Sequence, residues 1–130
     1  MDGRKLRTTR FKGGSSIHHG WLRAWWISAS GSGYCWYNNN KAEYGQTYGA
    51  LYNWYAVSGD SLCPTGWHVP IRSEWETLIS YLGGADVAGG KLKERGTLHW
   101  QIVNEGATNE SGFTALPGGY YQTYRKKFNY

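Results

Sequence analysis

The sequence lacks any long apolar run. It has 130 residues, and none of them lies in an uninterrupted apolar stretch of about 18 residues, the length that a membrane-spanning helix needs. The first 20 residues are polar and basic and lack the apolar core of a signal peptide. We therefore expect no membrane span and no export signal within this chain.

Cysteine is also scarce. Only Cys35 and Cys63 are present, so the chain can form one disulfide bond, and their spacing does not give the two close pairs of a zinc site. Two adjacent histidines, His18 and His19, are expected on a loop, where they would bind metal only incidentally. We predict no metal and no cofactor.

Acidic residues are outnumbered by basic ones. Fourteen Lys and Arg against nine Asp and Glu give a net charge of +5. The basic residues gather in residues 4–12 and 125–127, whereas most aromatic rings lie between Trp21 and Trp100. A surface that binds nucleic acid would interleave cations and rings. We therefore interpret the ends as solvated and do not expect nucleic-acid binding.

Aromatic residues and glycine are abundant. Rings make up 17% of the chain, which also has 19 glycines and one methionine. Disordered chains are poor in aromatics, and a chain of this length buries about two-thirds of its unfolded surface. The composition predicts a single loop-rich domain over residues 1–130, with Trp and Tyr in its core.

Apolar periodicity predicts two helices. In residues 47–57, Leu51, Trp54 and Tyr55 recur at helical spacing. In the second helix, just after Pro70, the apolar stripe is Trp75, Leu78, Ile79 and Leu82, and Gly83 and Gly84 end it.

The start of the second helix has no good capping residue. Ile71 stands where a capping hydroxyl would be worth about 1 kcal/mol. We therefore expect this start to be shifted or frayed unless Ser73 caps it.

The rest of the chain predicts short strands and loops. We expect one strand in the basic start, one over 34–37 that ends at the turn-forming asparagines 38–40, and short segments over 89–93, 98–100 and 113–121. The apolar segment 21–27 is interpreted as irregular. Strands and helices that are segregated in this way indicate an α+β domain.

Several aromatic blocks resemble one known family. The runs YGALYNWYAV (48–57) and LCPTGWHVP (62–70), with the blocks 6–11, 34–39, 74–75, 89–94 and 106–119, are similar to the Fibrobacter succinogenes major paralogous domain, a bacterial surface family. The resemblance covers most of residues 5–119. It implies a C-type lectin-like fold related to the formylglycine-generating enzyme, with two helices against a small twisted antiparallel sheet and long loops as the binding face.

The same resemblance bears on completeness, location and disulfides. It implies that the chain lacks the family's N-terminal strand pair and C-terminal strands, and that the protein is secreted or at a bacterial cell surface. Cys35 and Cys63 match family cysteines, and a bridge between them would close a loop of about 28 residues, worth roughly 3 to 4 kcal/mol. The alternative is two free thiols; we favour the bridge.

No residues predict catalysis. His68 has no nucleophile or carboxylate placed by spacing to meet it, so we expect its imidazole to bond backbone while Trp67 packs in the core. Formylglycine generation needs a cysteine pair in the final third of the domain, and no cysteine follows Cys63. A weak calcium site in the loop 104–110 is conceivable, but a hydrogen-bonded loop is the favoured interpretation. We do not expect an enzyme.

Binding is the function that the composition favours. Rings with nearby amides have the character of an antibody paratope, although we expect about half of these rings in the core. The candidate ligand-binding residues are Trp36, Tyr37, Asn38, Asn39, Tyr44, Tyr120, Tyr121 and Tyr124, with Tyr34, Asn40 and Gln122 nearby. They predict a non-enzymatic extracellular recognition module, of a bacterium or a phage, for a glycan or a protein.

Two alternatives stay open. The chain could be a structural or self-assembling surface protein, a homo-oligomer in which a neighbour completes a shortened sheet. It could also be a display protein whose loops a retroelement diversifies. The segment 21–27 would favour a partner if it were exposed, because its three Trp, one Leu and one Ile would form a sticky surface.

Overall fold

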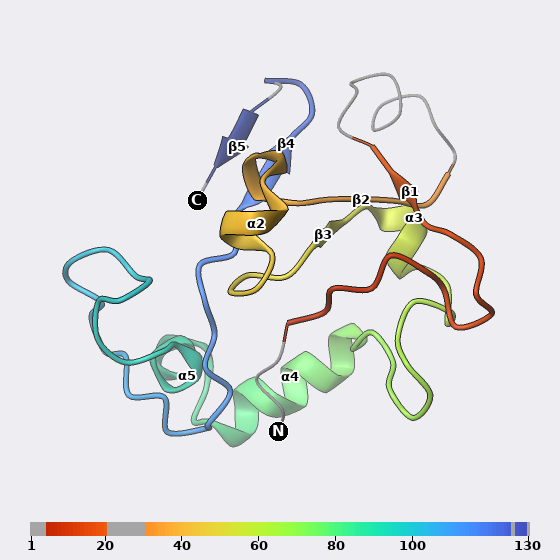
Figure 1. The fold of residues 1–130 in the computed structure, drawn as a ribbon. Helices are drawn as coiled ribbons and strands as arrows, with labels where there is room; N and C mark the ends of the chain where they lie inside the picture. Colours follow the sequence, from red (N-terminus) through yellow and green to blue (C-terminus); the bar gives the residue numbers. More distant parts are fainter. Residues whose placement is uncertain (1–4, 21–30, 126, 130) are drawn as a thin grey trace. The chain divides into compact units, whose positions relative to one another are not determined.

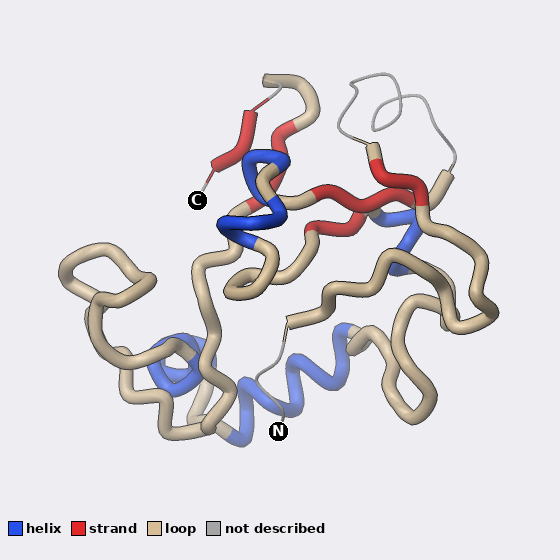
Figure 2. Tube along the Cα trace, in the orientation of Figure 1, coloured by secondary structure: helices blue, strands red, loops and turns tan. Residues whose placement is uncertain are grey.

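The computed structural model describes residues 5–20, 31–125 and 127–129. The chain divides into two compact units. We call Lys5–Val69 with Gly118–Tyr130 the strand unit, and Met1–Arg4 with Pro70–Pro117 the helical unit. Figure 2 shows that all strands of the described residues belong to the first. The segment 21–27, predicted to be irregular, lies outside the described residues.

The strand unit contains a three-stranded sheet of order β1-β2-β3 (Figure 1). Its strands are β1 (His18–His19), β2 (Gly33–Cys35) and β3 (Leu51–Tyr52). β1 runs parallel to β2, and β2 runs antiparallel to β3 with Tyr34 opposite Tyr52. The sheet is therefore mixed rather than antiparallel, and the two histidines stand in a strand rather than on a loop.

The basic start forms no strand in its described part. Residues 5–12 contribute one isolated bridge, between Arg10 and Ser16. The Leu6 carbonyl accepts a hydrogen bond from the Ala50 amide at 3.0 Å. The predicted strand was therefore wrong, because this segment bonds to loops rather than to a strand ladder.

The chain leaves β2 through asparagines in left-handed backbone conformation. Asn38 and Asn39 have φ of 49° and 56°, a region that asparagine tolerates better than most residues. They lie in the 3₁₀ turn η1 (Tyr37–Asn39), which is followed by the one-turn helix α2 (Lys41–Tyr44). The Asn40 side chain caps α2 by accepting from the Glu43 amide at 3.2 Å. The strand thus ends two residues earlier than predicted, and α2 was missed.

The helix predicted over 47–57 is mostly wrong. Only α3 (Trp54–Val57) is helical, and Leu51 and Tyr52 form β3. Gly49 interrupts the pattern with a φ of 75°, and a Cβ there would lie 2.6 Å from the Leu6 carbonyl oxygen. Asn53 then starts α3, because its Oδ1 accepts from the amides of Ala56 at 3.0 Å and Gly33 at 2.9 Å.

A hairpin completes the strand unit. β4 (Tyr120–Gln122) pairs antiparallel with β5 (Lys127–Asn129), and Tyr121 lies opposite Phe128. The strand predicted over 113–121 is confirmed only at its end. The core of the unit is aromatic and aliphatic, formed by Ile17, Tyr34, Trp36, Ala56 and Leu62.

The helical unit contains α4 (Arg72–Tyr81), which confirms the second predicted helix. Its start is not shifted, because the Glu74 carboxylate accepts a hydrogen bond from the Ile71 amide at 2.8 Å. This is half of a capping box. The helix ends where Gly83 and Gly84 adopt φ near 100°.

A further helix, α5 (Ala85–Leu92), was predicted as a glycine-punctuated strand. Gly90 is needed within it, because a Cβ there would collide with the carbonyl of Gly106. Residues 98–100 form bends rather than a strand. Helices and small sheets together confirm the α+β class.

Candidate functional site

A cluster of four rings joins two distant segments of the strand unit. The Tyr37 ring lies 5.1 Å from that of Tyr44 and 5.2 Å from that of Phe128, and Phe128 lies 4.9 Å from Tyr121. Gly119 packs on the Tyr37 ring, since a Cβ at Gly119 would lie 2.8 Å from a carbon of that ring. This ring cluster brings Tyr37 and Tyr44 together with Gly119, Tyr121 and Phe128, so most of the candidate residues lie on segments that meet in one region.

The candidate residues differ in exposure. Trp36 is 4% exposed and Tyr37 is 5% exposed, and Tyr34 is also buried. Tyr44, Tyr121 and Gln122 are half-buried. Tyr37 therefore holds the two segments together from inside. The exposed candidates are Asn38, Asn39, Asn40, Tyr120 and Tyr124. We call these five residues, which lie on the two segments that the ring cluster joins, the amide-aromatic face.

Hydrogen bonds order the hairpin part of this region. The Gln122 side-chain amide donates to the Tyr124 hydroxyl at 2.7 Å. The Arg125 guanidinium lies 5.5 Å from the centre of the Tyr124 ring. Tyr124 is 70% exposed, so it keeps a broad accessible surface beside these two polar neighbours.

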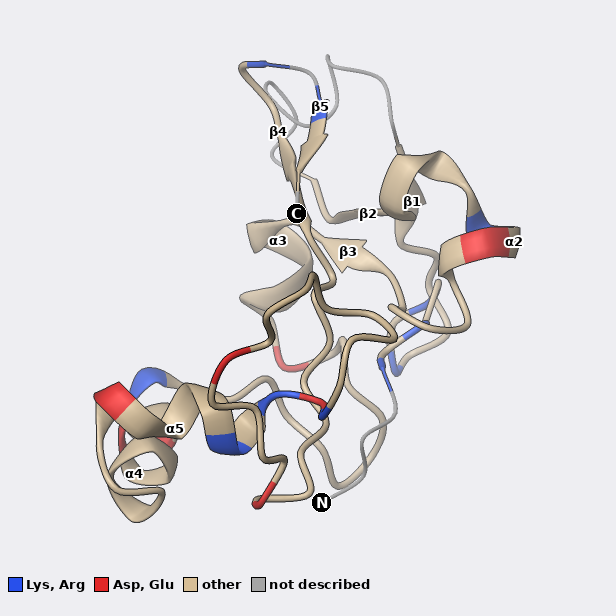
Figure 3. Ribbon diagram, turned by 90° about the vertical axis from the view of Figure 1, so that its left-hand side faces the viewer, with Lys and Arg blue, Asp and Glu red and all other residues tan. Residues whose placement is uncertain are grey.

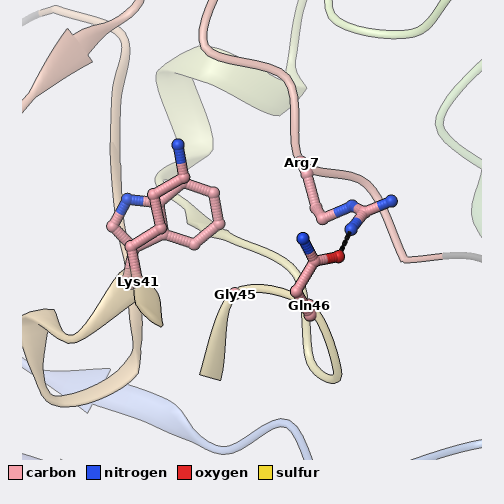
Figure 4. Close-up of a pocket in the computed structure, with 5 residues that line it drawn as sticks. Arg7, Lys41, Gly45 and Gln46 are labelled. Carbon is pink, nitrogen blue, oxygen red and sulfur yellow. Dashed lines mark hydrogen bonds between the residues drawn. The ribbon is translucent and has the colours of Figure 1, made fainter. Parts of the chain in front are cut away.

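A pocket of about 240 Å³ lies on the same unit (Figure 4). Its lining residues are Arg7, Trp36, Lys41, Gly45 and Gln46. Gly45 leaves no room for a side chain, because a Cβ would lie 2.6 Å from the Lys41 carbonyl oxygen and 3.2 Å from a Trp36 ring carbon. The pocket thus has one aromatic wall, one amide and two cations.

The pocket cations have no acidic partner among the described residues. The Arg7 guanidinium donates to the Gln46 side-chain oxygen, and the Lys41 ammonium lies 5.4 Å from the centre of the Trp36 ring. The nearby Glu43 carboxylate accepts a hydrogen bond from the Asn40 amide at 2.9 Å. Sequence analysis identified Trp36 as a candidate but missed the other four residues that line the pocket. Arg7 was interpreted as part of a solvated end, and it lies 39 positions before Gln46 in the chain.

Charge separates between the two units. In sequence, the strand unit contains nine Lys and Arg and two Asp and Glu, a net charge of +7. The helical unit contains five and seven, a net charge of −2. In Figure 3, basic positions mark the β4–β5 hairpin, whereas α4 and α5 carry both acidic and basic positions. The pocket therefore belongs to the more basic part of the chain.

Cys35 and Cys63 are free thiols, contrary to the favoured disulfide. Side chains alternate between the two faces of a strand. Tyr34 and Trp36 face the core, so Cys35 between them points to the other face. Cys63 follows the core residue Leu62. Burial raises the pKa of the Cys35 thiol from 9.0 to about 12, and burial also raises the pKa of Cys63.

The residues considered for catalysis and for calcium binding differ in exposure and in hydrogen bonding. His68 is exposed, and Trp67 is exposed rather than in the core as predicted. Asn109 donates to the Thr114 hydroxyl at 2.9 Å and accepts from the Thr114 amide at 2.8 Å. Asn104 donates to the carbonyl of Glu94 at 2.7 Å. The prediction of a hydrogen-bonded loop over 104–110 is confirmed.

Sequence reasoning missed one polar pair in the helical unit. The His99 imidazole Nδ1 lies 2.8 Å from a carboxylate oxygen of Glu94. The Trp100 indole donates to the Ala115 carbonyl at 3.0 Å. Two residues five positions apart on an irregular loop give no periodic pattern in the sequence, so this pair could be recognised only in the structure.

Clustered metal ligands and membrane-spanning helices are both absent from the described part of the chain. No group of three or more His, Cys, Asp or Glu residues is placed there to hold a metal ion. No helix there has the length and apolar character to cross a membrane.

Comparison with known proteins gives one match. The model of the family described as Fibrobacter succinogenes major domain matches residues 3–130. No curated protein and no solved structure matches the chain.

Proposed function

The chain belongs to the Fibrobacter succinogenes major domain family, and from the geometry of the strand unit we propose that it is a non-enzymatic recognition module. It is secreted or held at a bacterial cell surface, and it binds a glycan or a protein. Its α+β architecture is of the C-type lectin-like kind, in which loops rather than strands carry the binding face.

The observation that carries the proposal is the ring cluster that joins the two segments of the amide-aromatic face. Tyr37, buried against Gly119 and Phe128, joins an asparagine-rich turn to the β4–β5 hairpin. Exposed tyrosines offer flat contact area at low entropy cost, and the side-chain amides of Asn38 and Asn39 can adapt their hydrogen bonds to hydroxyls or peptide groups. The Asn40 side chain is engaged by Glu43 instead. Neither this face nor the pocket lining includes a nucleophile beside a base, which favours binding over catalysis.

A glycan array tests this function with one face variant and one matched control. Tyr124→Ser removes a ring that is 70% exposed on the face, and Tyr81→Ser removes an exposed ring from α4. We expect Tyr124→Ser to weaken binding about tenfold or more, as loss of an anchoring tyrosine does, and Tyr81→Ser to leave it unchanged. Equal losses, or no binding by the natural sequence to glycans or to surface proteins, would contradict the proposal.

Exposed apolar side chains in the helical unit favour a second candidate, self-assembly. Leu98, Ile102 and Val103 are all largely exposed on one loop, and such residues mark contact surfaces. Light scattering after size exclusion, with and without reductant, tests this. A species larger than 14.7 kDa that becomes monomeric when the three residues are changed to Ser supports assembly, and a monomer at all concentrations rejects it.

A further inference from the structure

We infer that the pocket between Arg7 and Lys41 binds the carboxylate of an acidic sugar, a uronic acid unit of a glycan. This inference rests on the proposed function, because it names the class of glycan that the strand unit would recognise. Three features carry it: two cations without acidic partners, a neutral hydrogen-bonding amide, and an aromatic wall.

The cations are the first feature. A guanidinium has five N–H donors, and Arg7 donates to the neutral Gln46 side chain. In the described residues of the helical unit, by contrast, Arg72 lies 2.7 Å from Glu76 and Lys91 lies 3.5 Å from Glu110. Cations that face a pocket without a protein carboxylate are available to an anionic ligand, and charge-assisted bonds are stronger than neutral ones.

The surrounding charge supports the same ligand. The strand unit carries a net charge of +7, which attracts anions and speeds their arrival. Glu43 is the acidic residue nearest in sequence to Lys41, and its carboxylate is engaged by the Asn40 cap. No acidic residue lines the pocket, so nothing there competes with an incoming carboxylate.

The amide and the aromatic wall indicate a sugar rather than a bare anion. Figure 4 shows the Gln46 amide oxygen turned to Arg7 and its nitrogen turned away, which leaves N–H donors for a sugar hydroxyl. Trp36 lines the pocket beside Gly45; the residue is 4% exposed, so it offers the C–H groups of a sugar a small apolar contact rather than an open stacking face. The volume of about 240 Å³ is below the roughly 300–1,000 Å³ of drug-sized sites, so it suits one monosaccharide unit.

Titration by two-dimensional NMR tests the inference on the full chain. The probe is sodium glucuronate, glucose is its neutral counterpart, and NaCl holds the ionic strength constant. We expect glucuronate to shift the Trp36 indole N–H, the Gln46 side-chain amide and the Arg7 Nε–H with a Kd on the order of millimolar. We expect glucose to bind at least tenfold more weakly.

Charge-matched variants separate the pocket from the general field. Arg7→Gln and Lys41→Gln each remove one cation from the pocket, and Lys127→Gln removes one from exposed β5. We expect either pocket change to weaken glucuronate about tenfold or more, the usual loss for a hydrogen bond between charged groups. The β5 change should alter affinity by no more than about twofold. The unliganded spectra report whether each variant is folded.

Several outcomes would overturn the inference. If Lys127→Gln weakened glucuronate binding as much as the pocket variants do, the attraction would be diffuse. If glucose bound as tightly as glucuronate, the carboxylate would have no role. If inorganic phosphate bound as tightly as glucuronate, the sugar would have no role. The two proposals fail differently. If neutral glycans bind in a way that depends on Tyr124 and glucuronate shifts no pocket signal, only the pocket assignment is rejected. Glucuronate shifts confined to the pocket, with no array binding that depends on Tyr124, reject the amide-aromatic face.

Discussion

The two units of this chain bury very different side chains. In the strand unit the buried apolar residues include Tyr34, Trp36 and Tyr37, whereas in the described part of the helical unit they are only Leu82 and Ala88. The strand unit is also strongly basic and the helical unit slightly acidic. One unit is thus organised around packed rings, and the other around helix caps, ion pairs and hydrogen-bonded loops.

This difference shows where binding can be supported. Buried rings fix the backbone around them, because large aromatic side chains contribute most of the packing energy of a core. The turn 38–40 and the strands β4 and β5 are fixed in this way through Tyr37, Tyr121 and Phe128. The loop over 94–104 is held by polar contacts instead, such as the pair between His99 and Glu94.

The largest expected effect contrasts one tryptophan from each unit. Trp36→Ala removes a buried ring, and we expect a loss of about 3–5 kcal/mol in the free energy of unfolding. Trp75 on α4 is 39% exposed and touches Phe113 at a centroid distance of 6.1 Å, so Trp75→Ala should cost about 1–2 kcal/mol. Urea unfolding measures both. Equal losses would show that the helical unit depends on ring packing as much as the strand unit does.

The next effect concerns the backbone against the ring cluster. Gly119→Ala places a Cβ 2.6 Å from the Asn129 carbonyl oxygen, at a residue with φ of 68°. We expect a loss of about 2–4 kcal/mol from strain and overpacking. Gly118→Ala is the matched control, because no atom lies within 4 Å of its added Cβ. If thermal unfolding shifts equally for both variants, the close contact with Tyr37 is not what holds the hairpin.

Alkaline pH should weaken the strand unit. Burial raises the pKa of Cys35 from 9.0 to about 12, so the folded state binds this proton more tightly than the unfolded state does. Its stabilising contribution is complete below about pH 9 and is lost toward pH 12, by up to about 1.4 kcal/mol per pH unit. Burial also raises the pKa of Tyr52. Urea midpoints at several pH values should fall less steeply in Cys35→Ala, and identical slopes would contradict this origin.

The smallest effect improves the helical unit. Ile71 precedes α4 with no side-chain cap and is exposed. Ile71→Thr supplies a hydroxyl that can accept a backbone N–H of the first turn, and we expect a gain of about 0.5–1 kcal/mol. Hydrogen exchange of the α4 amides measures the gain locally. Ile71→Val, which changes size without adding a hydroxyl, should give none, and equal protection in both variants would contradict the capping explanation.

The sequence predicts those elements whose signals are local. α4 was recognised because its apolar stripe and terminal glycines lie within 15 residues, and the asparagine turn 38–40 was recognised from residue type. The segment 47–57 misled the same reasoning. Its ring spacing fits a helix, but Leu51 and Tyr52 pair with β2, and Gly49 lies against Leu6. Contacts of that sequence separation are not encoded in a periodic pattern.

The candidate site was half predictable for the same reason. Rings and amides identified the region around Tyr37 and Tyr124, because composition suffices to suggest a binding face. The burial of the Tyr37 ring depends on contacts with Phe128 and Gly119, which lie 82 or more positions later in the sequence. α5 shows the same limit, since glycine disfavours helices, and Gly90 is explained only by its contact with Gly106.

The ring cluster also has a consequence for how the chain is made. Tyr37 leaves the ribosome early, but Gly119 and Phe128, which cover it, are added only after the whole of 70–117. The two helices of that intervening stretch are neighbours in sequence, and local contacts form quickly. We therefore expect the helical unit to acquire structure during synthesis before the strand unit, which needs Gly119 and Phe128 to cover Tyr37. The asparagine turn and the hairpin would then come together only after Gly119 and Phe128 have been added.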